Sequence, residues 1–408
     1  MGFRGVHARD GLAPHALPKA PNASPLLVTR DHMKHRTLGR TGLSVGELGL
    51  GTEYLIGKPQ ETVDSVVHRA IDAGVNFIDL LYGVDHFLDQ FGITLRDCRD
   101  RVYLASHMGS GAKNGQIAYF NNRPDCERLF AETLHRLETD HIDVLFAHMV
   151  DSNHEYDTWG GEMLKLAGHY QQQGKVRHVG LSSHDMPVAL RAVRSGDVDV
   201  LMFPLSAAND AMPDRQTLLS ACLEHNVGLI AMKPFAGGRL FDQAASIELT
   251  RAQSGEHGDF KNVHIDRPAA VTAVQCLSYV LSQIGVSTVI PGIADDSQLD
   301  ETLEYLTADD QQRDYGPMLA SISQHRRGEC VYCNHCLPCP VHLDIGAALR
   351  LGDRSDLQSA CAVQAEYDLL AVKASACTAC GACEKRCPFG VTVIEKMAKV
   401  ADRLESVV

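Results

Sequence analysis

Eight of the 13 cysteines in this 408-residue chain lie in two short runs near its C-terminal end. In each run the first three cysteines are separated by two residues, and the fourth is followed by proline. The runs are Cys330, Cys333, Cys336 and Cys339, and Cys377, Cys380, Cys383 and Cys387. Three thiolates at this spacing can bind three irons of one cubane from a single loop, so the runs predict two [4Fe–4S] clusters.

The fourth ligand of each cluster must come from another part of the chain. The second run has the spacing of bacterial ferredoxins, and the first differs by one residue before Cys339. In two-cluster ferredoxins the fourth cysteine of each run binds the other cluster, so we expect Cys387 to complete the first cluster and Cys339 the second. Zinc and disulfides are the alternatives. A zinc site usually has two ligand pairs with a longer spacer, which these closely spaced thiols do not provide.

The composition is that of an acidic globular protein. Hydrophobic residues make up 45% of the chain and the net charge is −13, which argues against a nucleic-acid-binding surface. No segment approaches the roughly 18 unbroken apolar residues of a membrane-spanning helix. Residues 1–35 have no apolar signal core and predict a flexible N-terminal extension. Free thiols and oxygen-sensitive clusters indicate a reducing, cytoplasmic location.

Short apolar runs alternate with helical patterns across residues 36–307. Strands that are buried on both faces of a parallel sheet have continuous apolar sequences. The alternation of such sequences with helical patterns therefore predicts a (β/α)8 TIM barrel. An open doubly wound sheet is the alternative, but the glycines after the first run are too few for its dinucleotide fingerprint. Residues 308–408 predict a small α-helical two-cluster module. The expected strands are 45–51, 76–81, 102–106, 142–148, 176–182, 198–204, 227–234 and 286–291.

Polar side chains follow several of these strands at the end where barrels keep their active sites. Asp79, His107 and His148 end the second, third and fourth strands. Because these ends converge on one mouth, we expect the three to form one site. The later strand ends carry a second group, which consists of Ser182, Ser183, Lys233, Gly237, Gly238, Gly292 and Gln298. The glycines there would let the backbone approach a phosphate closely.

Five motifs in this order resemble the aldo-keto reductase superfamily, in its branch with a C-terminal iron–sulfur module. They are residues 38–45, 76–79, 143–148, 174–183 and 290–299. The resemblance implies that Asp79 and His148 are catalytic, that Ser182 and Ser183 contact a nicotinamide, and that the loop with Gly292 and Gln298 binds nucleotide phosphates. We group Lys233, Gly237 and Gly238 with these cofactor-binding residues.

The sequence departs from the family's Asp, Tyr, Lys and His tetrad at two positions. The position of the tyrosine is Val84 and that of the lysine is His107. Tyr82 could take the place of the family's tyrosine if this loop, compared with that of the family, is shorter before Tyr82 and longer after it. A histidine in place of lysine can itself donate or accept a proton near neutral pH, so His107 and His148 predict an acid–base pair.

The leading hypothesis is an iron–sulfur oxidoreductase that acts on a carbonyl or hydroxyl group of a small molecule. Asp295 and Asp296 after the last strand would repel a 2′-phosphate, which favours NAD(H) if a nicotinamide binds. A flavin remains open as a cofactor, since barrels can hold one without a motif. One alternative is a reductase that receives electrons from a ferredoxin-type donor without a nicotinamide. The other is a non-redox isomerase or lyase that uses the histidine pair and has structural clusters.

Overall fold

The computed structural model describes residues 30–113, 116–209, 214–241, 271–321, 328, 330, 336–357, 360–387 and 390–405. Most of the predicted N-terminal extension, residues 1–35, therefore lies outside the described residues, and so does Cys333 of the first cysteine run.

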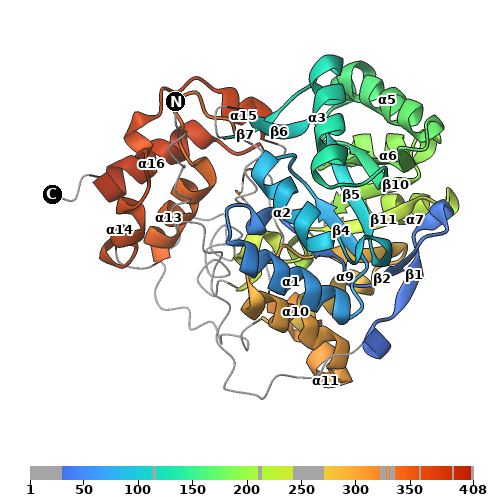
Figure 1. Ribbon diagram of the computed structural model, residues 1–408. Coiled ribbons are helices and arrows are strands. Elements are labelled where there is room, and N and C mark those ends of the chain that lie inside the picture. The colour runs from blue at the N-terminus through green and yellow to red at the C-terminus, as the bar shows by residue number, and fades with distance from the viewer. Residues whose placement is uncertain are drawn as a thin grey trace.

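Eight parallel strands form a closed barrel (Figure 1). Bridges between Leu48 and Val289 and between Gly51 and Gly292 join its first strand to its last, which excludes the open sheet. The predicted barrel is confirmed, because each expected run contains or overlaps one strand. In pairing order the strands are β3 (Leu50–Gly51), β4 (Phe77–Leu80), β5 (Tyr103–Met108), β8 (Ile142–Ala147), β9 (Val176–Ser182), β10 (Val200–Pro204), β11 (Gly228–Met232) and β12 (Val286–Ile290).

The first expected strand, residues 45–51, is divided in two. Its beginning is β2 (Ser44–Gly46), which pairs antiparallel with β1 (His35–Thr37), and only its end is β3. The chain between them passes close to its neighbours, since a Cβ at Gly49 would lie 2.9 Å from the side chain of Ile290. Leu38, in the turn of the β1–β2 hairpin, is fully buried in the apolar cluster inside the barrel. The hairpin therefore closes the N-terminal end of the barrel.

Each barrel strand is followed by a helix on the outside of the barrel (Figure 1). The first of these buries one stripe of side chains at helical spacing, namely Val63, Val66, Val67, Ala70 and Ile71. The eight helices are α1 (Gln60–Asp72), α2 (Asp85–Leu95), α3 (Arg123–Arg136), α5 (Gly161–Gln172), α6 (Met186–Ser195), α7 (Arg215–Glu224), α9 (Ala273–Leu281) and α10 (Asp296–Thr307).

Short elements occupy the connections. The longest is a β-hairpin between β5 and α3, formed by β6 (Ser110–Lys113) and β7 (Gln116–Tyr119). The others are η1 (Arg30–His32), η2 (Gly39–Thr41), η3 (Glu53–Leu55), η4 (Arg99–Arg101), α4 (Asn153–Glu155), η5 (Tyr156–Gly160), η6 (Ala207–Asn209), η7 (Ala236–Phe241), α11 (Asp310–Arg313) and α12 (Gly316–Ser321).

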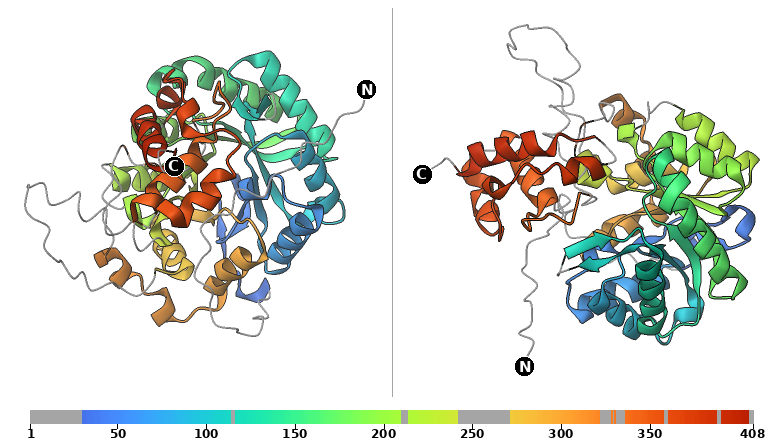
Figure 2. Two further views of the ribbon diagram at one scale, coloured as in Figure 1. Left: turned by 90° about the vertical axis from the view of Figure 1, so that its left-hand side faces the viewer. Right: turned by 90° about the horizontal axis from the view of Figure 1, so that it is seen from above.

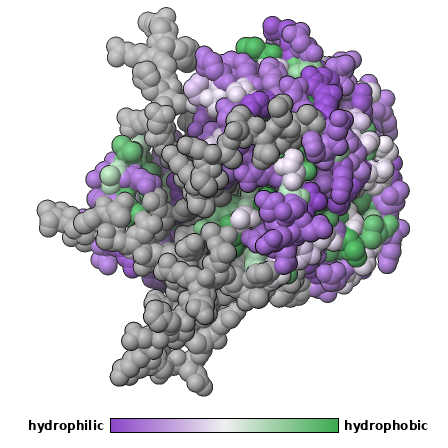
Figure 3. All heavy atoms as spheres, turned by 90° about the horizontal axis from the view of Figure 1, so that it is seen from below, coloured by the Kyte–Doolittle hydropathy of each residue, from purple (hydrophilic) through white to green (hydrophobic). Residues whose placement is uncertain are grey.

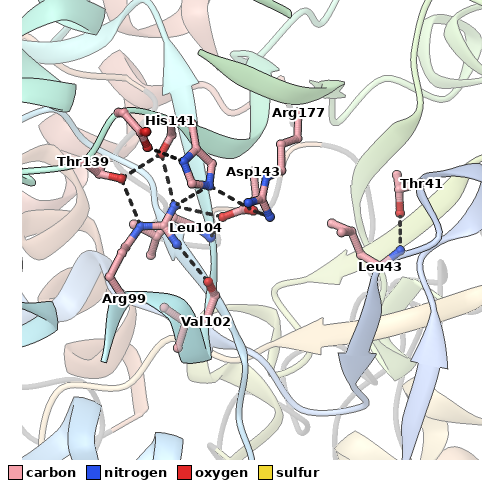
Figure 4. Close-up of polar contacts among 10 residues, drawn as sticks. Thr41, Leu43, Arg99, Val102, Leu104, Thr139, His141, Asp143 and Arg177 are labelled. Atoms are coloured by element: carbon pink, nitrogen blue, oxygen red, sulfur yellow. Dashed lines mark hydrogen bonds and ion pairs between the residues drawn. The ribbon is translucent and has the colours of Figure 1, made fainter. Parts of the chain in front are cut away.

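A fully buried carboxylate lies near the N-terminal end of the barrel (Figure 4). Asp143, the second residue of β8, accepts hydrogen bonds from Arg99 Nη2 at 3.0 Å, Arg177 Nη1 at 2.8 Å and the Leu104 backbone N–H at 2.9 Å. Arg99 also donates to the Val102 carbonyl at 2.9 Å. Two permanent cations therefore neutralise this charge and join β5, β8 and β9 where they begin.

The C-terminal segment forms a helical module with its own hydrophobic cluster, which extends from Leu337 to Leu404. The module lies beside the barrel in the right-hand view of Figure 2 and in front of it in the left-hand view. A hydrogen bond of 2.8 Å from Arg239 Nη1, in η7, to the Cys330 carbonyl joins its beginning to the C-terminal mouth. Its elements are α13 (Ile345–Leu357), α14 (Ala360–Asp368), η8 (Ala374–Ala376), α15 (Ala382–Arg386) and α16 (Val393–Glu405).

The face of the barrel in Figure 3 is mostly hydrophilic, with small separate hydrophobic patches. Among the described residues, the model contains no helix that is both long enough and apolar enough to cross a bilayer.

Candidate active site

A cavity opens at the C-terminal mouth of the barrel. Most of the predicted site residues line it. They are Asp79, His107, His148, Ser182, Lys233, Gly237, Gly238, Gly292 and Gln298.

Three of these residues form a buried chain of hydrogen bonds. Asp79 Oδ1 is 2.9 Å from His107 Nε2, and His107 Nδ1 is 3.0 Å from His148 Nδ1. Each of the three residues is 4% exposed. The sequence predicted that these side chains would converge, and the structure brings them into direct contact.

The order of acceptors along this chain determines where its protons lie. A carboxylate only accepts, so His107 Nε2–H donates to Asp79. When His107 is neutral, its Nδ1 accepts from His148 Nδ1–H, and His148 Nε2 then carries a lone pair. When this chain takes up one proton, His107 Nδ1–H donates to His148 Nδ1 instead, and His148 Nε2 carries a proton. We call the chain Asp79–His107–His148 the relay. Its end, His148 Nε2, is an acceptor without the added proton and a donor with it.

Aromatic rings enclose the relay. Phe146 stacks on His107 with 4.9 Å between ring centroids, and Tyr119 of the β6–β7 hairpin stacks on His148 at 5.2 Å. Burial lowers the pKa of His148 well below its usual value, and electrostatic interactions with His107, His184 and Lys233 lower it further. His148 is therefore predominantly neutral near neutral pH when the cavity is empty.

Two predicted residues are not among those that line the cavity. Tyr82 is 2% exposed and its hydroxyl is 3.4 Å from that of Tyr119. The Ser183 hydroxyl donates to the Val150 carbonyl at 2.7 Å. Alternation along a strand explains both placements, because Asp79 and Leu81 face the cavity and Tyr82 is out of phase with them. Ser182 and His184 likewise line the cavity, whereas Ser183 lies between them.

A second polar chain reaches the cavity from the other side of Ser182. Lys233 Nζ is 2.7 Å from His184 Nε2, and His184 Nδ1 is 3.1 Å from Asp151 Oδ2. Neither Asp151 nor His184 was among the predicted site residues. The sequence held a signal for both, since His184 is in phase with Ser182 and Asp151 comes three residues after His148.

The electrostatics of this second chain favour a neutral histidine between two charges. Burial lowers the pKa of His184, and the adjacent Lys233 charge lowers it further, against the opposing effect of Asp151. Burial would raise the pKa of Asp151, but contacts with His184 outweigh it and the net pKa is lowered. Burial also raises the pKa of Glu53, and the interaction with Lys233 offsets part of this increase.

The segment after β11 has an unusual backbone. Lys233 and Ala236 have φ of 57° and 49°, and Gly237 and Gly238 have φ of 69° and 87°. Glycine adopts this left-handed region without steric cost, whereas a lysine there is strained. The strained backbone takes Lys233 out of the strand's alternation and turns it into the cavity.

The loop after β12 keeps its two carboxylates in contacts within the protein. Asp295 caps α10 by accepting from the Gln298 N–H at 3.0 Å, and Asp296 accepts from Arg69 at 2.7 Å. Gln298 in turn accepts from the Ala294 N–H at 2.9 Å.

Four cysteines of the module line a separate cavity of about 350 Å³. They are Cys339, Cys377, Cys380 and Cys383, the set expected to bind one cluster. Arg386 also lines this cavity and donates to the carbonyls of Cys336 and Pro338 at 2.6 and 2.8 Å, which joins the two runs. Across the described parts of the chain, no group of three or more His, Cys, Asp or Glu side chains is placed to hold a single metal ion.

Comparisons with known proteins agree with the barrel. The model of the "Aldo/keto reductase family" matches residues 43–315. "Uncharacterized oxidoreductase YqkF" of Bacillus subtilis (strain 168) is 25% identical over 296 residues, or 68% of this chain and 92% of that protein. The structure of "aldo-keto reductase AKR11C1 from Bacillus halodurans (holo form)" superposes with a TM-score of 0.56 at 20% identity, over 71% of this chain and 97% of that one. The family match ends before both cysteine runs.

Proposed function

The chain belongs to the aldo/keto reductase family, and on that basis we propose that it interconverts a carbonyl and a hydroxyl group on a small molecule at the barrel mouth. The observation that carries the proposal is the Asp79–His107–His148 relay, which lines the large cavity and can end in either a donor or an acceptor.

Members of this family generally use NAD(P)H, which supplies the hydride when it is bound. Ser182, Gly292 and Gln298 are the residues that we propose to contact it, together with Lys233, Gly237 and Gly238. We propose NADH rather than NADPH, since Asp295 and Asp296 place carboxylates in the loop after β12.

The relay would handle the proton that accompanies reduction of the carbonyl. In its protonated form, His148 Nε2–H donates to the carbonyl oxygen as that oxygen gains negative charge. The proton on His107 Nδ1 then moves to His148 Nδ1, while Asp79 continues to accept from His107 Nε2–H. Oxidation of an alcohol runs in reverse, with His148 Nε2 as the base. In this way two histidines would replace the family's tyrosine and lysine.

Calorimetric titration of anaerobically prepared protein with NADH and with NADPH tests this proposal. We expect NADH to bind, and oxidation of NADH by a panel of small carbonyl compounds to depend on His148. Failure of both nucleotides to bind would contradict a nicotinamide-dependent function.

For the C-terminal module we propose two [4Fe–4S] clusters, held by Cys330, Cys333, Cys336 and Cys387 and by Cys377, Cys380, Cys383 and Cys339. In support, the four described cysteines of the second set surround one cavity, with ligands from both runs. A cubane binds each thiolate through a different iron, so its ligands lie farther apart than those of one ion.

Iron and sulfide analysis with electron paramagnetic resonance tests the clusters directly. We expect about eight irons per chain, two cubanes of four. Cys383→Ser should lower the iron content and alter the spectrum. Cys98→Ser, at a buried cysteine of the barrel, is the matched control and should retain both. Zinc in place of iron would exclude the proposal.

A reductase that takes electrons from a ferredoxin-type donor is the second candidate function. The contact that favours it is the hydrogen bond between Arg239 and the Cys330 carbonyl, because η7 also lines the active-site cavity. When bound, clusters supply single electrons, which a nicotinamide does not. We propose a small-molecule substrate, this donor as partner, and a cytoplasmic location. Reduction of a carbonyl compound by dithionite-reduced protein without nicotinamide would favour this candidate.

A further inference from the structure

The chain Lys233–His184–Asp151 reaches the active-site cavity, and the proposed hydride transfer does not use it as an acid. An ammonium only donates and a carboxylate only accepts, so His184 is held between them as one neutral tautomer, with its proton on Nδ1. The bonds on its two sides measure 2.7 and 3.1 Å, and the His184 side chain is 2% exposed. This chain therefore presents a fixed donor, the Lys233 ammonium, at the cavity wall.

The two polar chains end in opposite roles. The Asp79–His107–His148 relay ends in a lone pair on His148 Nε2 when it has not taken up a proton, and the second chain ends in a donor. Reduction of a carbonyl consumes one proton, which one chain can supply. A base and an acid that face one cavity are instead the requirement for moving a proton at a carbon next to a carbonyl.

We propose that this cavity also catalyses enolisation of 2-hydroxy ketones and 2-hydroxy aldehydes, with His148 as the base and Lys233 as the acid at the carbonyl oxygen. The inference names a substrate class for the proposed oxidoreductase site and rests on that proposal for the carbonyl group. It adds an activity that needs neither a nicotinamide nor a cluster.

The step is balanced without an oxidant or a reductant. The C–H bond of the hydroxyl-bearing carbon breaks, and its proton passes to His148 Nε2. The electron pair forms the C=C bond of an enediol, and the former carbonyl oxygen takes a proton from Lys233. Reversal returns to carbon a proton that has exchanged with solvent through the relay.

The substrate class follows from the polarity of the two ends. Lys233 requires an acceptor such as a carbonyl oxygen, and His148 Nε2 requires an acidic C–H bond on the adjacent carbon. A 2-hydroxy carbonyl compound presents both, and its hydroxyl group makes the product of the step an enediol. Much of the rest of the lining is apolar, with Met202, Phe235 and Ile290 among its members, which suits a small uncharged molecule.

The surrounding charges favour the same roles. Burial and nearby positive charge lower the pKa of His148, so it is in its basic form at neutral pH. Burial raises the pKa of Glu53, the carboxyl that interacts with Lys233 in the same cavity. The proposal places Lys233 as a donor at the oxygen that becomes negative, where removing one such donor costs about 10²–10³-fold in rate.

Deuterium incorporation at carbon, followed by proton NMR in D2O without any nucleotide, tests the inference. The probes are hydroxyacetone, dihydroxyacetone and glycolaldehyde, each with the full-length protein. We expect the wild type to exchange at least one probe well above the buffer rate, and Lys233→Met to lower that rate by about 10²-fold or more. Lys165→Met, at an exposed lysine of α5, is the matched control and should exchange like the wild type.

Two further variants separate catalysis from folding. Lys233→Arg retains a cation and should restore part of the exchange that Lys233→Met loses. Asp151→Asn leaves Lys233 in place but removes the carboxylate that fixes the His184 tautomer, so it should shift the pH profile of exchange. Circular dichroism establishes that each variant is folded.

Each outcome decides the inference separately from the proposed function. Exchange of none of the probes, or exchange by Lys233→Met at the wild-type rate, overturns the inference, even if the protein oxidises NADH with a carbonyl compound. Exchange that depends on Lys233 supports it, even if neither nucleotide binds and the oxidoreductase proposal fails.

Discussion

Two buried aspartates, at opposite ends of the same barrel, have different kinds of partner. Asp143, near the N-terminal end, accepts from Arg99 and Arg177, whose charges are permanent at physiological pH. Asp79, at the mouth, accepts from His107, which continues to His148. The carboxylate between the two arginines joins the beginnings of three strands and so contributes to stability. A carboxylate that begins a chain of histidines can support a proton moving along it.

The largest expected effect is on catalysis at the mouth. His148→Gln removes the end of the relay and should lower the turnover of carbonyl reduction by about 10²–10⁴-fold. His169→Gln, an exposed histidine of α5, is the matched control and should leave turnover unchanged. Steady-state kinetics with NADH measures both variants, and equal turnover by both would remove the relay from the mechanism.

The next effect is on stability at the other end. Asp143→Ala leaves Arg99 and Arg177 without their shared partner and should lower the free energy of unfolding by about 3–5 kcal/mol. Asp140→Ala, whose side chain is 96% exposed, should change it little. Urea unfolding measures the difference. Turnover per folded molecule should be retained in both variants, and its loss in Asp143→Ala would show that the two ends are coupled.

The buried histidines at the mouth should make the stability of the folded protein depend on pH. The pKa values of His148 and His184 are lowered in the folded protein, so below about pH 6.5 the unfolded chain binds protons that the native state does not. Stability should therefore fall as pH decreases from about 6.5, by up to about 1.4 kcal/mol per pH unit for each histidine. Chemical unfolding at several pH values should show a smaller slope for the His148→Gln/His184→Gln double variant, and an unchanged slope would contradict the burial of neutral histidines.

The smallest effect concerns the more exposed of the two arginines. The Arg177 side chain is 50% exposed and that of Arg99 is 20% exposed. Arg177→Ala should therefore lower the free energy of unfolding by about 1 kcal/mol or less, and Arg99→Ala by more. The reverse order in thermal melts would mean that neither the burial of Arg99 nor its hydrogen bonds to backbone carbonyls determines the stability of this end.

The sequence predicted the barrel because strands buried on both faces read as apolar runs, and it predicted the Asp79–His107–His148 site because each residue ends one of those strands. Tyr82, two residues beyond β4, is not among the residues that line the cavity, and its role as a replacement for the family's tyrosine stays a prediction. The contact between Asp151 and His184 joins two loops, and no local pattern specifies such a pairing. The orientation of Lys233 depends on its left-handed backbone conformation, which the presence of a lysine does not predict.

The cavity among the cysteines also limits when the module can be completed during synthesis. Cys339 precedes α13 and α14, and Cys377, Cys380 and Cys383 follow them, so the ribosome produces one wall of this cavity well before the others. All eight strands of the barrel precede Cys330 in the chain and can pair before either run is complete. The cysteine cavity can therefore be completed only after every barrel strand has been synthesised, and a chain truncated before Cys377 would retain all of those strands without a finished cysteine cavity.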